Sequence, residues 1–475
     1  MAQKYLGIDI GSTFIKGALI DVDNSRIGPV LREPFPNFIA GLPTLHREVD
    51  PQQVLLAVRG LIDRLLVHGD VCTGLVICTQ MHGLVLTDAQ ANPLTNITTW
   101  LDQRTLEATP RRDGSSFIRM SQLVTDDDRL TLGNDLSAGR PLSLLYWLNE
   151  CQSSSANQAD QFPCSLADFV VAHLCQTEPC SDTTNAAAHG ALDLRTGKWH
   201  QGLITRLGLN AYHWPRIVPA GTLVGYFEQH GQRIACYVPV GDHQCALLGS
   251  LLRHGELSIN AATGSQVGLL SKVLETSLDY QTRPYFDGEY LKAVIHIPAG
   301  RSLNALLRLL TELAAAENLH LSDPWGYIDK VTSDGPETEL MVNLAFFASS
   351  CGDHGAITGI REDNLTVRDL FTAAFNNMAE NYAACSKLIS AGSHIDSMVF
   401  AGGLLQKFTG LRRAIERRLP YPYRNAPTSE DTILGLVVIA QVCAGNAKTF
   451  AEASKLVSTH LGHQAATLPV QTRGL

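Results

Sequence analysis

The feature that most constrains the fold of this chain is a short sequence pattern that occurs twice: an apolar strand, a hydroxyl-rich corner and a second apolar strand. The first copy spans residues 6–21 and turns through Gly-Ser-Thr at 11–13. The second spans residues 257–270 and turns through Thr-Gly-Ser at 263–265. The two corners lie roughly 250 residues apart, about one domain length each. We therefore expect two similar lobes that close on one ligand from opposite sides.

The chemistry of the first corner suits the phosphates of a nucleotide. Its turn offers backbone N–H groups and two hydroxyls, and Lys16 follows in the second strand. Asp9 lies inside the first apolar run, where an unpaired charge is costly, so a hydrated cation is a natural partner. A plain hairpin with a solvent-facing carboxylate is the alternative. The chain has no G-x-x-x-x-G-K-S/T run and no G-x-G-x-x-G after the first strand, which excludes two common nucleotide-binding types.

Composition narrows the class of protein further. A chain of 475 residues that is 45% hydrophobic and 17% charged is typical of a globular protein with two domains. Its net charge of −9 argues against a nucleic-acid partner. The 11 cysteines show no zinc-like spacing and are expected to be reduced thiols. The longest apolar run, residues 433–445, is too short to span a bilayer, and no hydrophobic leader precedes the first strand, so we expect a cytoplasmic protein without a membrane partner.

Strand and helix patterns alternate through both halves of the chain, which is typical of α/β architecture. The boundary between the halves falls near residues 241–254. Residues 113–128 are polar, with three consecutive Asp residues, and predict a surface excursion. The clearest other elements are a helix at 51–68, a strand at 74–78, a strand at 398–401 and a basic helix at 406–418.

An acidic residue, Asp242, directly follows a glycine where a strand meets a helix. A carboxylate at such a turn can project into a cleft and accept the proton of a substrate hydroxyl, as phosphoryl transfer requires. The alternative is an N-cap that satisfies the first turn of the helix. From the residues alone, the cap is the more frequent reason for an Asp at this position.

A set of mostly polar residues, in two segments, follows two other strand patterns. It combines amide, imidazole, carboxylate and guanidinium groups with an aromatic plane, a mixture that suits a sugar, although a buried polar network uses the same residue types. Its members are Gln80, Met81, His82, Trp100, Asp102 and Arg104.

The order of these motifs resembles that of the FGGY-type carbohydrate kinases of the actin–hexokinase superfamily, over about residues 4–443. The first corner resembles the family's phosphate-1 motif, the second its phosphate-2 motif, and residues 398–408 its adenosine motif. Residues 355–376 resemble its C-terminal signature. The resemblance implies two ribonuclease-H-like domains, residues 1–247 and 248–475, with the active site in the cleft between them.

The resemblance also assigns roles to individual residues. It implies that Asp242 is the catalytic base, which reverses the preference for a cap, and that Asp9 positions Mg²⁺ through water. Nucleotide contacts are implied for Gly11, Ser12, Thr13, Lys16, Thr263, Gly264, Ser265, Gly300, Gly402 and Gly403. Sugar contacts are implied for Gln80, Met81, His82, Trp100, Asp102, Arg104, Asp242 and Gln244.

Within the family, the Gly-Asp-x-Gln sequence at Asp242 resembles both glycerol kinases and sedoheptulokinases, and the segments 100–104, 168–175 and 265–266 look most like the sedoheptulokinase branch. The resemblance thus implies ATP, magnesium and a sugar as ligands, with transfer of the γ-phosphoryl group to a primary hydroxyl of a seven-carbon ketose. A pentulose or another polyol is the alternative substrate, and a homodimer is left open. A catalytically silent binding protein and a mechanical ATPase are alternatives from other classes.

Overall fold

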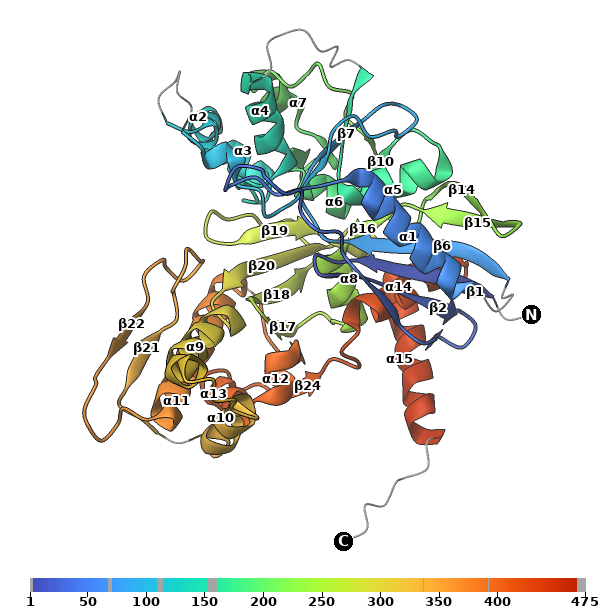
Figure 1. Ribbon diagram of the computed structural model, residues 1–475. Helices are drawn as coiled ribbons and strands as arrows, with labels where there is room; N and C mark the ends of the chain where they lie inside the picture. The colour runs from blue at the N-terminus through green and yellow to red at the C-terminus, as the bar shows by residue number, and fades with distance from the viewer. Residues whose placement is uncertain are drawn as a thin grey trace.

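The computed structural model describes residues 3–66, 71–108, 114–151, 160–335, 337–391 and 393–467. Two sheets, each with helices on its outer face, lie on either side of a central pair of helices (Figure 1). The predicted α/β architecture with two lobes is confirmed, and each lobe is built around one sheet.

The first sheet contains the first predicted hairpin. Its strand order is β14-β15-β6-β1-β2-β3, with β16 paired to β6 and β4 to β2. Apolar residues of β1 pack against the helices α1 (Pro51–Leu65) and α5 (Leu166–Cys175). Helix α1 begins as predicted, and the predicted end at His68 lies outside the described residues. The strands are β1 (Lys4–Ile10), β2 (Phe14–Asp21), β3 (Arg26–Ile27), β4 (Leu31–Pro34), β6 (Cys72–Thr79), β14 (Leu223–Gln229), β15 (Gln232–Tyr237) and β16 (Val240–Gly241).

The second sheet contains the second predicted hairpin, and its strand order is β19-β20-β18-β17-β23-β24. Its outer face packs against α9 (Gly300–Ala316), α10 (Pro324–Thr332) and α11 (Val367–Ile389). The basic helix predicted at 406–418 is instead two helices, α12 (Gly403–Lys407) and α13 (Thr409–Arg418). The strands are β17 (Glu256–Ala261), β18 (Ser265–Ser271), β19 (Gln281–Pro284), β20 (Tyr290–Ile297), β23 (Ser397–Ala401) and β24 (Tyr423–Asn425).

Two helices cross between the sheets. Helix α8 (Asp242–Gly249) leads from the first lobe to the second, and α14 (Asp431–Cys443) returns to pack against β1 and β6. The crossing needs glycine on both sides, because a Cβ on Gly249 would lie 1.8 Å from the carbonyl oxygen of Asp431 and one on Gly435 would lie 2.0 Å from that of Cys245. This close contact holds the start of α8, and therefore Asp242, against residues that come from the far end of the chain.

A helical group above the first sheet corrects one prediction. Residues 113–128 were expected to form a surface excursion, but most of their described part forms α2 (Ser116–Leu123) and the start of α3 (Asp126–Thr131), while Asp113 lies outside the described residues. Asp128 is buried between Arg206 and the Thr125 cap, so a charge run that looks solvated holds two helices together. Helices α4 (Pro141–Cys151) and α7 (Gln201–Arg206) complete this group.

Smaller elements connect these parts: β5 (Glu48–Val49), β7 (Val85–Thr87), β8 (Ile97–Thr98), η1 (Arg104–Leu106), β9 (Phe162–Cys164), β10 (Cys180–Asp182), α6 (Thr183–Ala188), β11 (Leu192–Asp193), β12 (Lys198–Trp199), β13 (Arg216–Val218), η3 (Phe286–Gly288), β21 (Met341–Asn343), β22 (Ala356–Thr358) and α15 (Phe450–Thr467). Helix α15 projects from the body of the molecule towards the C-terminus (Figure 1). Within the described ranges, none of the helices has both the length and the apolar character needed to cross a bilayer.

Candidate active site

A cavity of about 850 Å³ opens between the lobes. Both hairpin corners, the turn after β6 and the start of α8 border it. The predicted residues that line it are Ser12, Gln80, Met81, His82, Trp100, Asp242, Gly264 and Ser265. The other predicted residues lie around or behind this lining: Asp9, Gly11, Thr13, Lys16, Asp102, Arg104, Gln244, Thr263, Gly300, Gly402 and Gly403.

The first hairpin holds a carboxylate and an ammonium group side by side. Strands β1 and β2 pair so that Asp9 lies opposite Lys16, whose Nζ is 3.9 Å from Asp9 Oδ2 and 3.2 Å from Glu430 Oε2. The Thr432 hydroxyl donates to Asp9 Oδ2 at 2.7 Å. Burial raises the pKa of Asp9, while the Thr432 hydrogen bond and the Lys16 charge act against that rise. Helix α14 thus supplies the groups that keep this corner in place.

The second hairpin corner meets two glycines that the sequence also singled out. The Gly300 N–H donates to the Ala262 carbonyl at 3.1 Å, and a Cβ on Gly300 would lie 2.6 Å from that oxygen. Gly402 has a left-handed backbone, with φ of 85°, and a Cβ there would lie 2.3 Å from the carbonyl oxygen of Ala261. Only glycine fits at these close approaches. Three segments far apart in the sequence therefore converge at one corner.

Asp242 is the first residue of α8 and is half-buried in the cavity wall. Burial, followed by repulsion from Asp9, raises its pKa to about 7. The turn before it is fixed by Thr184, whose hydroxyl accepts the Gly241 N–H at 2.8 Å and donates to Asp182 at 2.8 Å. Gly241, not Asp242, occupies the N-cap position of α8. A carboxyl with a pKa near neutrality at this position is suited to accepting a proton.

The turn after β6 places an amide and an imidazole in the cavity wall. The Gln80 side chain donates to the Gly11 carbonyl at 3.3 Å, which ties this turn to the first corner. His82 has a left-handed backbone, with φ of 68°, and its Nδ1 is 3.3 Å from the Ala188 carbonyl. Burial, followed by the charge of Arg140, lowers the pKa of His82 well below its usual value, so the ring is neutral near pH 7.

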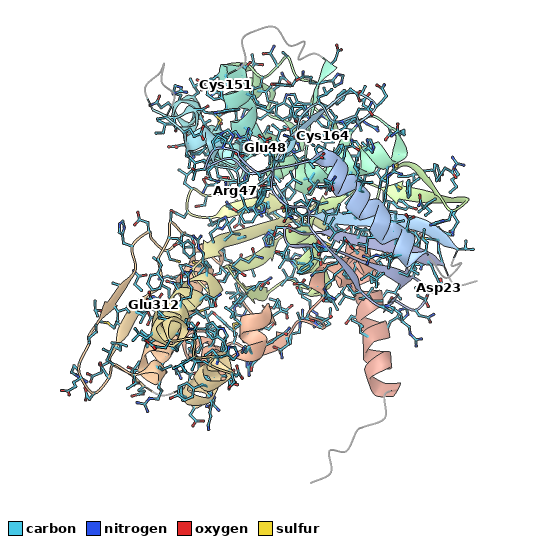
Figure 2. All side chains as sticks on the ribbon, viewed as in Figure 1. Asp23, Arg47, Glu48, Cys151, Cys164 and Glu312 are labelled. Atoms are coloured by element: carbon cyan, nitrogen blue, oxygen red, sulfur yellow. The ribbon has the colours of Figure 1, made fainter. Side chains whose placement is uncertain are left out.

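Trp100 lines the cavity, whereas its neighbours Asp102 and Arg104 point into the protein. Asp102 is fully buried and accepts from Arg104 Nε at 2.8 Å and from the Arg47 N–H at 2.7 Å. Arg104 also pairs with Glu48 at 2.6 Å. Arg47 and Glu48, labelled in Figure 2, lie close together in the upper lobe. This ion cluster fixes the loop that carries Trp100, so a sugar contact by the two charged residues stays a prediction.

Gln244 is also turned away from the cavity. Its side chain is fully buried, and its Nε2 donates to the Pro284 carbonyl at 3.2 Å. The contact joins α8 to β19, so Gln244 links the two lobes. A direct sugar contact by Gln244 also stays a prediction.

Several residues that line the cavity were missed in the sequence. Among them are two buried arginines, two further histidines and a pair of polar side chains beside the second corner: Arg140, His243, Asn260, Gln266, Arg283 and His296. Both arginines directly precede a proline, as Arg140-Pro141 and Arg283-Pro284, and this was only a weak signal of a functional position. The fold brings the two segments together, and nothing in their spacing indicates it.

The donor set fits magnesium held mainly through water. Mg²⁺ keeps several waters and binds through one or two carboxylates together with substrate phosphates. The charge of Asp9 contributes to the raised pKa of Asp242, after burial. Among the described residues no cluster of three or more acidic, histidine or cysteine ligands could enclose a metal alone. A cation here would depend on the phosphates of a nucleotide.

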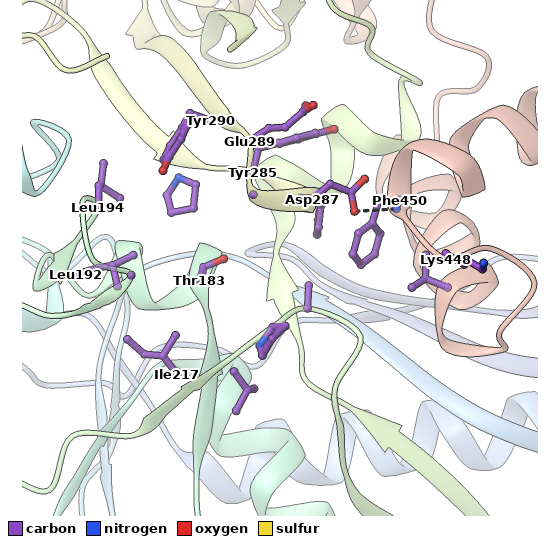
Figure 3. A pocket seen from close by; sticks show the side chains of 18 residues that line it. Thr183, Leu192, Leu194, Ile217, Tyr285, Asp287, Glu289, Tyr290, Lys448 and Phe450 are labelled. Carbon is purple, nitrogen blue, oxygen red and sulfur yellow. Dashed lines mark hydrogen bonds between the residues drawn. The ribbon is translucent and has the colours of Figure 1, made fainter. Parts of the chain in front are cut away.

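Two further cavities, of about 540 and 680 Å³, lie on the other side of η3. Asp287 borders both, and its carboxylate accepts the N–H group of Phe450 at 3.0 Å (Figure 3) and that of Ala451 at 2.8 Å. Both carboxylate oxygens therefore cap the N-terminus of α15. Neither hairpin corner nor Asp242 is among the residues that line these two cavities, and we place the chemistry in the larger cavity between the lobes.

Comparison with known proteins identifies the class. A family model described as the N-terminal domain of the FGGY family of carbohydrate kinases matches residues 4–249. Mouse sedoheptulokinase is 21% identical over 465 residues, covering 88% of this chain and 93% of the relative. Two solved structures share the fold over 98% of this chain. Xylulose kinase from Rhodospirillum rubrum has a TM-score of 0.82 and 15% identity, and 98% of that chain is covered. Glycerol kinase from Plasmodium falciparum with ADP has a TM-score of 0.78 and 14% identity, and 96% of that chain is covered.

The chain belongs to the FGGY family of carbohydrate kinases. The predicted resemblance is thereby confirmed, as is the fold of the actin–hexokinase type. The three proteins are named for different substrates, and the similarity to this chain is too low to transfer any one of them.

Proposed function

We propose that the protein transfers the γ-phosphoryl group of ATP to a primary hydroxyl of a ketose. The observation that carries this proposal is the position of Asp242, a carboxyl of pKa about 7 in the wall of the cavity between the lobes, which both hairpin corners border. Asp242 accepts the hydroxyl proton as the oxygen attacks the γ-phosphorus, and the phosphorus–oxygen bond to ADP breaks.

The remaining groups support the transfer by position and charge. The corners at residues 11–13 and 263–265 bind the phosphates through N–H groups and hydroxyls, and Ser12, Thr13, Thr263 and Gly264 are their exposed residues. Magnesium near Asp9 would supply charge neutralisation when bound. Lys16 adds a fixed positive charge beside the first corner. Closure of the lobes excludes water, which would otherwise accept the phosphoryl group.

For the acceptor we propose sedoheptulose, phosphorylated to sedoheptulose 7-phosphate. The segments 100–104 and 168–175 and the similarity to a sedoheptulokinase over most of the chain support a seven-carbon ketose. A pentulose is the second candidate, because the Gln-Met-His-Gly sequence at 80–83 is shared with xylulokinases. We further propose that residues 1–247 and 248–475 form the two domains and that the protein works in the cytoplasm.

A coupled ADP-release assay over ketoses and polyols of three to seven carbons tests the proposal. We expect ADP release that depends on a sugar and is greatest for a ketose. Release without any sugar would indicate a mechanical ATPase, and no release with any compound would indicate a silent binding protein. Asp242→Asn should keep nucleotide binding and lose most of kcat, whereas an active variant would exclude Asp242 as the base.

A further inference from the structure

Two arginine side chains line the cavity beside Asp242, and both are buried. Arg140 lies in the loop before α4 and is 4% exposed, and Arg283 lies on the edge strand β19 and is 3% exposed. Asp135 lies between them: it accepts a hydrogen bond from Arg140 Nη2, and its Oδ2 is 3.3 Å from Arg283 Nη2. The arginines come from different lobes, so the pair exists only when the cavity is assembled.

The charges of this group do not balance. Two guanidinium ions share the single carboxylate of Asp135, and their other partners are neutral. Arg283 Nη2 donates to Gln281 Oε1 at 2.9 Å, and Arg283 Nη1 is 3.1 Å from His243 Nδ1. Arg283 Nε is buried and has no hydrogen-bond partner within the described residues. A buried cation with an unpartnered donor is unfavourable, and an anion that enters the cavity would remove both costs.

Asp242 does not fill this role. Its carboxylate feels the positive charge of Arg283, which acts to lower its pKa, yet the described residues show no hydrogen bond between the two side chains. Asp242 must also be free to accept a proton if it is the base. The surplus positive charge is therefore available to a ligand.

Neutral histidines surround the arginine pair. Burial, followed by the nearby arginine charges, lowers the pKa of His243 to about 3 and also lowers that of His296. His296 lies at an irregularity in the pairing of β20 with β18 and has a left-handed backbone, with φ of 58°. Such strain is retained where a side chain is held for a purpose. These rings offer donors and acceptors to hydroxyl groups and add no charge.

We infer that the ketose phosphorylated at Asp242 carries a carboxylate, which Arg140 and Arg283 bind at the end remote from the reacting hydroxyl. The inference rests on the proposed phosphoryl transfer at Asp242 and, among ketose acceptors, favours a sugar acid over neutral sedoheptulose; such an acid keeps the ketone and the primary hydroxyl. A planar guanidinium matches a carboxylate with two parallel hydrogen bonds. A carboxylate brings one negative charge to the pair, whereas a phosphate dianion would bring two beside the ionised Asp242.

The test compares three acceptors of equal carbon number in the ADP-release assay: a neutral ketose, the corresponding keto sugar acid and the ketose monophosphate. We expect kcat/KM for the acid to exceed that for the neutral ketose by at least about tenfold, the worth of a charge-assisted hydrogen bond. Arg140→Gln and Arg283→Gln should each bring this ratio close to one. Arg283→Lys keeps the charge without the planar fork and should give an intermediate ratio.

A matched control is Arg424→Gln, which removes a partly buried arginine that pairs with Glu256 and does not line the cavity. It should leave the acid-to-neutral ratio unchanged. A second measurement needs no turnover and no variant: the keto acid should raise the apparent Tm of the unaltered protein more than the neutral ketose does.

The outcomes separate the two proposals. A neutral ketose or a ketose monophosphate that is used better than the acid overturns the carboxylate and leaves the kinase intact. A ratio that persists in both glutamine variants overturns the arginine pair as its cause. If no acceptor is phosphorylated, the proposed function fails, and the shift in Tm still decides whether the cavity binds the acid.

Discussion

Replacing Asp242 with asparagine should remove activity and stabilise the folded protein at the same time. The carboxyl has a pKa of about 7 in the folded protein and an ordinary value of 3.8, because burial and Asp9 disfavour its charged form. The difference corresponds to roughly 4 kcal/mol at 1.36 kcal/mol per pH unit. The favourable interaction of a negative charge with the N-terminus of α8 reduces the gain by up to about 1 kcal/mol. The net gain expected at pH 8 is about 3 kcal/mol.

The gain depends on pH in a defined direction. Since the folded pKa is raised, the protonated carboxyl costs nothing below pH 3.8, and stability is lost as pH rises from there to about 7. The difference between Asp242→Asn and the unaltered protein should be small at pH 4.5 and constant above pH 7.5. Urea denaturation at a series of pH values measures it.

A matched control is Asp126→Asn. Asp126 occupies the first position of α3, as Asp242 does in α8, but its carboxylate is exposed. It should change stability by less than about 1 kcal/mol, with little variation over the same pH range. Equal stability of the unaltered protein and Asp242→Asn at pH 8 would refute the argument that burial and Asp9 oppose the charge of Asp242.

Three other predictions follow from the site. Because Asp242 must be deprotonated to act as the base, kcat/KM should rise with pH to a plateau with a midpoint near 7, and a flat profile from pH 5.5 to 8.5 would contradict this assignment. Lys16→Met should raise KM for ATP by roughly tenfold, through loss of one charged contact, and leave KM for the sugar unchanged in steady-state assays; equal changes in both constants would count against a phosphate contact. Arg104→Gln leaves the buried Asp102 and the half-buried Glu48 without their cation and should cost about 3–5 kcal/mol in urea denaturation. A variant of normal stability with a raised sugar KM would instead support the predicted sugar contact.

The sequence predicted those parts of the site whose chemistry is carried by a local pattern. A carboxylate inside an apolar strand, followed by a Gly-Ser-Thr corner, can be recognised without a partner, and β1–β2 and β17–β18 form where the pattern places them. Asp242 was recognised by its position in a strand-to-helix turn together with the order of the family's motifs. The choice between cap and base depended on that order, because one Asp after one glycine is compatible with both.

The prediction of a surface excursion at residues 113–128 was wrong because of a contact between distant residues. The run Asp126-Asp127-Asp128 looks solvated, yet Asp128 is buried because Arg206, 78 positions away, turns towards it. Asp102 and Arg104 have the residue types of a sugar site, and Glu48 and the Arg47 N–H hold them inside the protein, so their contact with a sugar stays a prediction. Residue type alone does not indicate which side of a loop faces the cavity.

What the sequence determined by itself is the chemistry of each strand and corner, since hydrophobic periodicity and turn residues act over a few neighbouring positions. Only the tertiary structure decided which of these pieces share a cavity. Arg140 and Arg283 are brought to one carboxylate by two lobes, and Thr432 reaches Asp9 because α14 returns to the first sheet. Contacts between such distant residues depend on how whole sheets and helices pack, and no short-range pattern records that arrangement.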